Sequence, residues 1–399
     1  MPIEGYVREV AWLLLGAVVI GLLARRVSVP YAIALVVGGL VLEESHIVAL
    51  PHLEPGVLLF AFLPPLLFDA AFRLDARELR LVARPVAWLA VPGVVATALL
   101  VGLAVWLLLD VPMSVGLLFG SVVAATDPIA VVTLLKPLDL PHRLSVIPEA
   151  ESLVNDGMAI TLYTALIGYV VGGVADPLGI LEYFLREVLG GALIGITLGI
   201  LFSRLTATLD DHLLEMLLST VLAYGSYLVA HDVHASGPLA CVAAGFIHGS
   251  YGRRVGMSVT TSRLLDDLWE YLGFVANAVV FLLVGFSVDI QNLRHDAPAV
   301  AVAVAAVLVA RVLVVAATRW TTAPNARLVR GERLIVAWAG LRGALTIALA
   351  LALPAVTPER DRLIAMAFGV VLFTLVVQGL SLPLLIRRVG LARQGAMHG

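Results

Sequence analysis

Charged and polar side chains interrupt some of the longest apolar runs in this sequence. Asp127 stands in the middle of the run 114–135, within the tripeptide Thr126-Asp127-Pro128. A charged side chain at the centre of a bilayer costs at least ~2.5–3.5 kcal/mol, so such a residue usually has a function. Because Pro128 lacks a backbone N–H and its ring clashes with the carbonyl four residues earlier, we expect the helix to open here. The released backbone groups and Asp127 would then coordinate an ion; the alternative is a kinked helix that Asp127 only caps.

The next apolar run, 146–174, contains three carboxylates within eight residues. One face of a helix takes positions i, i+1, i+4 and i+5, which are here Glu151, Ser152, Asn155 and Asp156. Three carboxylates cannot all stay ionised in a medium of low dielectric constant without cations beside them. We expect Glu149, which follows Pro148, to lie near the helix end in contact with water, and Asp156 to lie inside the membrane.

Two arginines, Arg311 and Arg342, also stand within long apolar segments. An unpaired buried arginine is costly, so we expect each to have an anionic partner. The candidate partners are Asp127, Glu151 and Asp156. Gly340 and Gly343 flank Arg342 and weaken the helix around it.

If these residues act within a membrane, the chain must form helices that cross it, and the amino-acid composition agrees with this. Of the 399 residues, 60% are hydrophobic and 14% are charged, and the mean hydropathy is +1.00. Such a composition excludes a soluble globule or a disordered chain, and a net charge of −3 does not suit a nucleic-acid binder. Backbone polar groups must be paired within the membrane, so each apolar run should be a helix. We predict an all-α polytopic membrane protein with about thirteen transmembrane helices, at 10–24, 30–42, 56–72, 86–109, 114–135, 146–174, 187–203, 213–230, 237–252, 270–288, 297–318, 333–356 and 363–385.

The basic residues predict the orientation of these spans. Of the 26 lysines and arginines, 19 lie in alternate loops and only 4 in the remaining loops and the N-terminus. The basic loops are 25–29, 73–85, 136–143, 204–212, 253–269, 319–333 and 386–399. The positive-inside rule therefore predicts an N-terminus outside and a C-terminus in the cytoplasm. We expect an integral protein of a bacterial or archaeal plasma membrane.

Two segments near the N-terminus allow more than one interpretation. The first run resembles a signal peptide, but Arg25 and Arg26 stand where a cleavage site needs small residues, so we expect a retained helix. The segment Arg73–Arg84 is either a solvated loop or a short helix at the membrane interface.

The fifth and twelfth runs are both interrupted, the fifth at Pro128 and the twelfth at Gly340 and Gly343. They are seven spans apart, and interrupted helices at matching positions of two halves are typical of inverted-repeat transporters with a site near mid-membrane. The single cysteine, Cys241, excludes a cysteine-based metal cluster, and the sequence has no Walker motif. We therefore expect a transporter without a cofactor and not an enzyme.

Several motifs resemble those of the monovalent cation–proton antiporters of the sodium/proton exchanger type, over nearly the whole chain. They are ATDP (125–128), PEAESLVNDG (148–157), ARV at Arg311, AGLRGA (339–344), FLPPLLFDAAF (62–72) and FLLVGF (281–286). The order of Asn155 and Asp156 is similar to that of the electroneutral branch of the family.

The resemblance implies a role for each matching residue. The cation- and proton-binding residues would be Thr126, Asp127, Ser152 and Asp156, with Na⁺ at Asp127, Ser152 and Asp156. The supporting residues would be Asn155, Glu151, Arg311 and Arg342. Asn155 would hold the broken helix in place, and Glu151 would pair with Arg311. The resemblance further implies a homodimer within which a core, about 86–174 and 297–385, moves against a dimerisation part, about 1–72 and 187–288, of one transporter unit, 1–399.

The function we expect is secondary active exchange of Na⁺ or Li⁺ for H⁺, electroneutral at 1:1, by alternating access in the lipid bilayer. Exchange of K⁺ for H⁺ is an alternative of the same class, because oxygen ligands suit both cations. A cation channel is an alternative of another class, but no filter-like loop is visible. An intramembrane aspartyl protease would also use two aspartates, yet the sequence has no GxGD-type motif.

Overall fold

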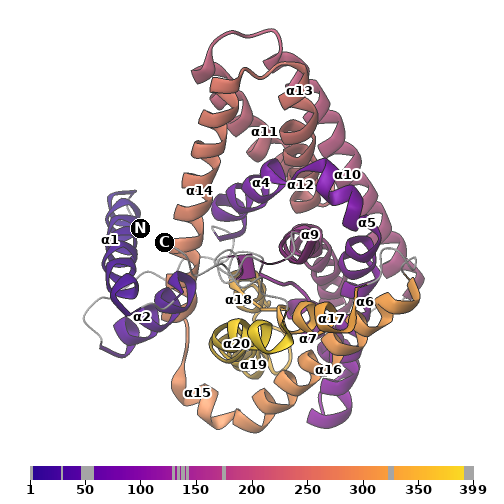
Figure 1. Ribbon diagram of the computed structural model, residues 1–399. Helices are drawn as coiled ribbons and strands as arrows, with labels where there is room; N and C mark the ends of the chain where they lie inside the picture. The colour runs from indigo at the N-terminus through magenta and orange to yellow at the C-terminus, as the bar shows by residue number, and fades with distance from the viewer. Residues whose placement is uncertain are drawn as a thin grey trace.

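The computed structural model describes residues 3–27, 30–45, 58–127, 131–132, 135, 140, 143–172, 177–321 and 328–390. Within these ranges the chain is mostly helical and contains no strand (Figure 1). The α-helices are α1 (Ile3–Val27), α2 (Tyr31–Ser45), α4 (Leu63–Arg73), α5 (Ala76–Ala90), α6 (Pro92–Leu109), α7 (Met113–Val122), α9 (Arg143–Gly172), α10 (Pro177–Thr206), α11 (His212–Asp232), α12 (Gly237–Ile247), α13 (Arg253–Val255), α14 (Val259–Phe286), α15 (Ile290–His295), α16 (Ala297–Thr321), α17 (Arg330–Trp338), α18 (Ala344–Leu351), α19 (Arg360–Phe373) and α20 (Gly379–Val389). Three short π-helical segments adjoin these helices: η1 (Leu58–Phe62) before α4, η3 (His248–Gly252) between α12 and α13, and η5 (Thr374–Gln378) between α19 and α20.

Seven helical segments among the described residues are long and apolar enough to cross a membrane. They are Ala76–Leu109, Arg143–Val171, Pro177–Thr206, His212–Asp232, Val259–Phe286, Ala297–Thr321 and Arg360–Val389, with Met113–Val122 as a shorter apolar helix. The predicted all-α polytopic fold is thereby confirmed, while the count of thirteen spans stays a prediction.

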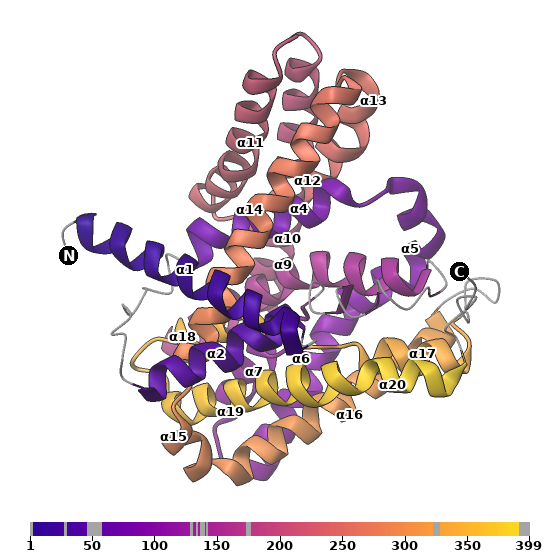
Figure 2. The same cartoon turned by 60° about the vertical axis from the view of Figure 1, so that its left-hand side comes forward.

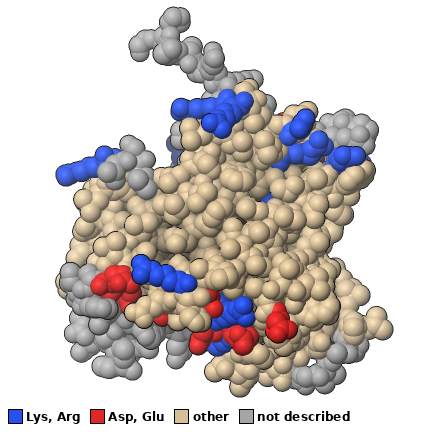
Figure 3. All heavy atoms as spheres, turned by 90° about the horizontal axis from the view of Figure 1, so that it is seen from below, with Lys and Arg blue, Asp and Glu red and all other residues tan. Residues whose placement is uncertain are grey.

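On one face of the molecule, charged side chains lie toward two opposite edges. On the face shown in Figure 3, Lys and Arg line one edge, and acidic side chains gather with further basic ones near the opposite edge. The broad band between these edges shows neither kind. A transmembrane protein needs such a band where its helices meet lipid tails, because charges there are costly.

The segment Arg73–Arg84 is largely helical, and the loop interpretation of it was wrong. Asp75 is the N-cap of α5, since its carboxylate accepts a hydrogen bond of 2.6 Å from the backbone N–H of Arg77. The helix α5 ends at Ala90, and α6 follows it after Val91, so that the two form one long segment, Ala76–Leu109. The helical segment that contains the predicted span 86–109 therefore begins at Ala76.

The helices form two groups, which we call the first and the second helix group (Figures 1 and 2). In the first group, α5, α6, α7, α9, α16 and α19 pack against one another, and α17, α18 and α20 join them. In the second group, α2, α4, α10, α11, α12 and α14 pack against one another. The helix α9 contacts both groups, through α4, α10 and α12 of the second. It thus lies where the groups meet.

Two helices of the first group are interrupted, in the fifth and twelfth runs as the sequence predicted. The helix α7 ends at Val122, and residues 125–127 continue without helical structure. The helix α17 ends at Trp338, and α18 begins only at Ala344. The helix therefore opens several residues before Pro128, which itself lies outside the described residues.

The two interruptions lie side by side. The backbone N–H of Asp127 donates a hydrogen bond of 2.8 Å to the carbonyl oxygen of Leu341. Small residues also let α7 approach α6 closely: a Cβ at Gly120 would overlap the carbonyl group of Ala98. Contact of this kind between helix backbones is typical of membrane proteins. These contacts fix the chain that carries Asp127 in place.

Candidate functional site

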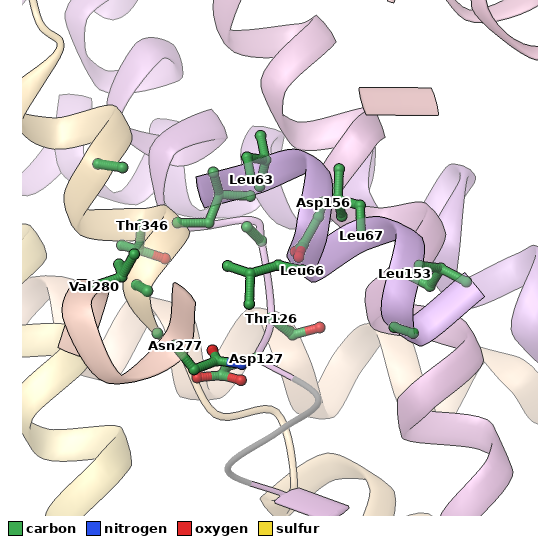
Figure 4. Close-up of a pocket in the computed structure, with 16 residues that line it drawn as sticks. Leu63, Leu66, Leu67, Thr126, Asp127, Leu153, Asp156, Asn277, Val280 and Thr346 are labelled. Atoms are coloured by element: carbon green, nitrogen blue, oxygen red, sulfur yellow. The ribbon is translucent and has the colours of Figure 1, made fainter. Parts of the chain in front are cut away.

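Asp127 and Asp156 line one small cavity where the interrupted chains meet α4, α9 and α14 (Figure 4). Asp127 comes from the unwound chain after α7, and Asp156 from α9. Both residues are buried, with 8% and 9% of their surfaces exposed. The cavity has a volume of about 60 Å³. A water molecule needs roughly 10–15 Å³ on this measure, so the space holds a few waters or a largely dehydrated ion.

The hydroxyl of Thr126 contacts two polar side chains of α9. The hydroxyls of Thr126 and Ser152 lie 2.7 Å apart, and the side-chain amide of Asn155 donates to the Thr126 hydroxyl at 3.2 Å. Among the described residues, one carboxylate oxygen of Asp156 has no hydrogen-bond partner. The site thus offers oxygen atoms, which suit a hard cation.

The predicted residues divide between the cavity wall and a supporting layer. Thr126, Asp127 and Asp156 line the cavity. Ser152 and Asn155 are buried behind them and contact Thr126. In the described part of the chain no group of three or more His, Cys, Asp or Glu is arranged to hold a metal ion. Na⁺ binding at Asp127, Ser152 and Asp156 therefore stays a prediction.

Glu151 and Arg311 form a buried ion pair that joins α9 to α16. Both guanidinium Nη atoms donate to the carboxylate, and the bond from Nη2 to Oε2 is 2.9 Å long. Nη2 also donates to the carbonyl oxygen of Val336 in α17, at 3.1 Å. A Cβ at Gly340 would lie 2.6 Å from Arg311 Nε, so a glycine leaves the space that the arginine fills. The contact predicted for Glu151 and Arg311 is present.

Arg342 has a partner other than the one we expected. In the described residues it forms no ion pair with a carboxylate; its Nη1 instead donates to the carbonyl oxygens of Ala124 at 2.6 Å and Ala125 at 2.7 Å. These carbonyls follow the end of α7, where the last turn of a helix leaves oxygen atoms unpaired and carries partial negative charge. The backbone N–H of Arg342 donates to the hydroxyl of Thr374 at 3.0 Å. Arg342 therefore holds the two interrupted chains together.

The N-terminus of α18 faces Asp127. Gly343 is the N-cap of α18, and a Cβ added there would overlap the Asp127 carboxylate. The unpaired N–H groups at a helix N-terminus attract an anion. Asp127 is thus held between the backbone of Leu341 and the start of α18.

Sequence reasoning did not single out the apolar side of the cavity. Leu63, Leu66 and Leu67 of α4 line it, and Figure 4 shows them beside Asp156. Apolar residues within an apolar run do not differ from their neighbours in the sequence, although this segment belongs to the motif FLPPLLFDAAF (62–72). Asn277 of α14 also lines the cavity.

Comparison with known proteins shows where this architecture occurs. The family described as "Sodium/hydrogen exchanger, transmembrane" matches residues 13–388. The Na⁺/H⁺ antiporter NhaH of Halobacillus dabanensis is 36% identical over 92% of this chain and 94% of its own length. The Na⁺/H⁺ antiporter NhaP of Pseudomonas aeruginosa is 36% identical over 84% of this chain and 81% of its own length. The structure of the sodium proton antiporter MjNhaP1 from Methanocaldococcus jannaschii has a TM-score of 0.81 at 20% identity, over 96% of this chain and 99% of that one. The chain belongs to the transmembrane sodium/hydrogen exchanger family.

Proposed function

We propose that this protein exchanges Na⁺ or Li⁺ for H⁺ across a membrane. The observation that supports this most directly is the pair of buried carboxylates, Asp127 and Asp156, in one cavity at the crossing of two interrupted chains. Relatives that align over most of the chain are named Na⁺/H⁺ antiporters. No cofactor takes part in the exchange we propose.

Coupling arises from competition at Asp156. Its carboxylate has one negative charge, which either a proton or a monovalent cation neutralises, so the two compete for it. Asp127 and the oxygen atoms of Thr126 complete the cation's coordination, and Ser152 supports Thr126. A cation that arrives from one side therefore releases a proton, and no ATP is needed.

Alternating access requires one part of the protein to move against another. We assign the movement to the core, about 86–174 and 297–385, and the fixed part to about 1–72 and 187–288, which forms a homodimer. The interface of the two helix groups beside the cavity supports this division. We place the N-terminus outside and the C-terminus in the cytoplasm of a bacterial or archaeal plasma membrane.

The test is cation-driven proton movement in sealed proteoliposomes. A pH-sensitive dye inside them should respond when Na⁺ or Li⁺ is added outside, and the Asp156→Asn variant should give no response while eluting as a folded protein in detergent. The variant removes both proton and cation binding but leaves the cavity wall. A response to K⁺ alone would favour K⁺/H⁺ exchange, and a current without obligatory proton movement would favour a channel. Exchange near the wild-type rate in Asp156→Asn would contradict the site.

A further inference from the structure

A second, larger cavity lies between the two helix groups and adjoins the cation site. Its volume is about 710 Å³, and its walls come from α1, α2, α4, α9 and α14. It shares Ala70 and Asn277 with the small cavity that contains Asp127 and Asp156. We take the large cavity as the approach to the site from this side.

The carboxylates of this cavity differ in exposure. The side chain of Glu270 is 66% exposed and that of Asp69 is 18% exposed. Asp69 immediately precedes the shared residue Ala70. Its carboxylate also lies against α14, where a Cβ at Gly273 would be 2.7 Å from Oδ2. Asp69 is thus adjacent in the chain to the wall that the two cavities share.

Arg73 forms ion pairs with Asp69 and Glu270. Its Nε donates to Asp69 at 2.6 Å, one turn away on α4, and its Nη1 donates to Glu270 on α14 at 3.3 Å. In the part of the chain that the structure describes, the charged residues that line the cavity are Arg25, Asp69, Arg73, Glu149 and Glu270. Among these, three carboxylates face two guanidinium groups. The charge of Arg73 lies beside the two carboxylates that an incoming cation would otherwise meet.

We propose that Arg73 is a tethered cation that lowers the apparent affinity for the transported cation on this side of the membrane only. The proposal rests on the proposed antiport. Arg73 neutralises part of the negative charge at the entrance, and Asp69, one turn away on α4, holds it there. Removing Arg73 raises the local cation concentration, and removing Glu270 lowers it. The two residues therefore act on the affinity in opposite directions.

The experiment measures the KM for Na⁺ separately on each side, in everted and in right-side-out membrane vesicles. Arg73→Gln should lower the KM about threefold to tenfold on the side of the large cavity, and Glu270→Gln should raise it by a similar factor. Neither should change the KM on the opposite side. Added choline chloride should weaken both effects, because salt screens charges near solvent.

Two further variants separate charge from structure. Arg73→Lys keeps the charge and should keep the wild-type KM. Arg77→Gln removes an arginine four residues further on, at the start of α5 and outside the residues that line both cavities, and should change nothing. A purely structural link between α4 and α14 would make Arg73→Gln and Glu270→Gln shift the KM in the same direction, or on both sides, and would overturn the proposal. Wild-type vesicles without any exchange would instead contradict the proposed function.

Discussion

At the scale of single residues, the position of Asp127 depends both on the missing side chain of Gly343 and on the backbone carbonyl of Leu341. A glycine at 343 leaves room for its carboxylate at the start of α18, and the carbonyl of Leu341 holds its backbone. Arg342 lies between these two residues and reaches back to the chain before Thr126. Three consecutive residues of the twelfth run thus position one carboxylate of the fifth.

Gly343→Ala tests this placement. The added methyl group would overlap the Asp127 carboxylate, so the carboxylate or the interrupted chain must shift. Overpacking of this kind costs typically about 1–3 kcal/mol, and we expect Na⁺-driven proton flux to fall at least about tenfold because a 1 Å displacement of a functional group can cost that much. The matched control is Gly168→Ala on α9, where a Cβ meets nothing within 4 Å. Equal flux in the two variants would show that Asp127 tolerates displacement.

Single residues also show how far sequence reasoning reaches at the site. Asp127, Asp156, Glu151 and Arg311 were found because a charge within an apolar run contrasts with its surroundings. The partners of Arg342 were not found, since backbone carbonyls have no signature in a sequence and become available only where a helix ends. The covering leucines of α4 were missed for the opposite reason, because they resemble every other lipid-facing or buried leucine.

At the scale of elements, both interruptions were predictable and one span boundary was not. Glycines at 340 and 343 indicated the break between α17 and α18, and Asp127-Pro128 indicated the break after α7. The start of α5 was ambiguous because Arg77, Arg80 and Arg84 lower the local hydropathy. The helix forms there nonetheless, since Asp75 caps it and its buried side includes Val82 and Val86.

The ion pair of Glu151 and Arg311 is the strongest polar connection between α9 and α16, and a double-mutant cycle tests it. Removing one partner leaves a buried charge, which costs roughly 3–5 kcal/mol. We expect Glu151→Gln and Arg311→Met each to lower the melting temperature in detergent clearly, and the double variant to recover part of the loss. Additive losses would mean that the two side chains do not interact.

A second ion pair provides the control for this cycle. Arg253 and Asp266 form a pair whose side chains are 28% and 36% exposed. Because water screens it, Asp266→Asn should cost only about 0–1 kcal/mol. Losses of equal size in Asp266→Asn and Glu151→Gln would show that burial does not set the strength of the inner pair.

At the scale of the whole molecule, the two helix groups enclose two neighbouring cavities. The large and the small cavity share Ala70 and Asn277, and both have walls from each group. The helix α4 contributes Asp69 and Arg73 to the large cavity and its leucines to the small one. A movement of the first group against the second would therefore change both cavities together, which is what alternating access requires.

The net charge that the moving part carries across the membrane depends on the ionisable side chains at the site. Glu151 is neutralised by Arg311, and Asn155 does not titrate. We expect Asp127 to keep its charge beside the N-terminus of α18, so that Asp156 alone exchanges a proton for a cation. The only lysine of the sequence, Lys136, lies outside the described residues and in a predicted cytoplasmic loop.

One proton then replaces one monovalent cation, and the moving part has the same net charge in both halves of the cycle. Transport should therefore be electroneutral. The measurement is Na⁺-driven proton flux in proteoliposomes under a diffusion potential set by potassium and valinomycin. A potential acts with ~2.3 kcal/mol per charge per 100 mV, so an electrogenic exchanger would respond steeply and this one should not. Flux that scales with the potential would mean that Asp127 also titrates and that two protons move for each cation.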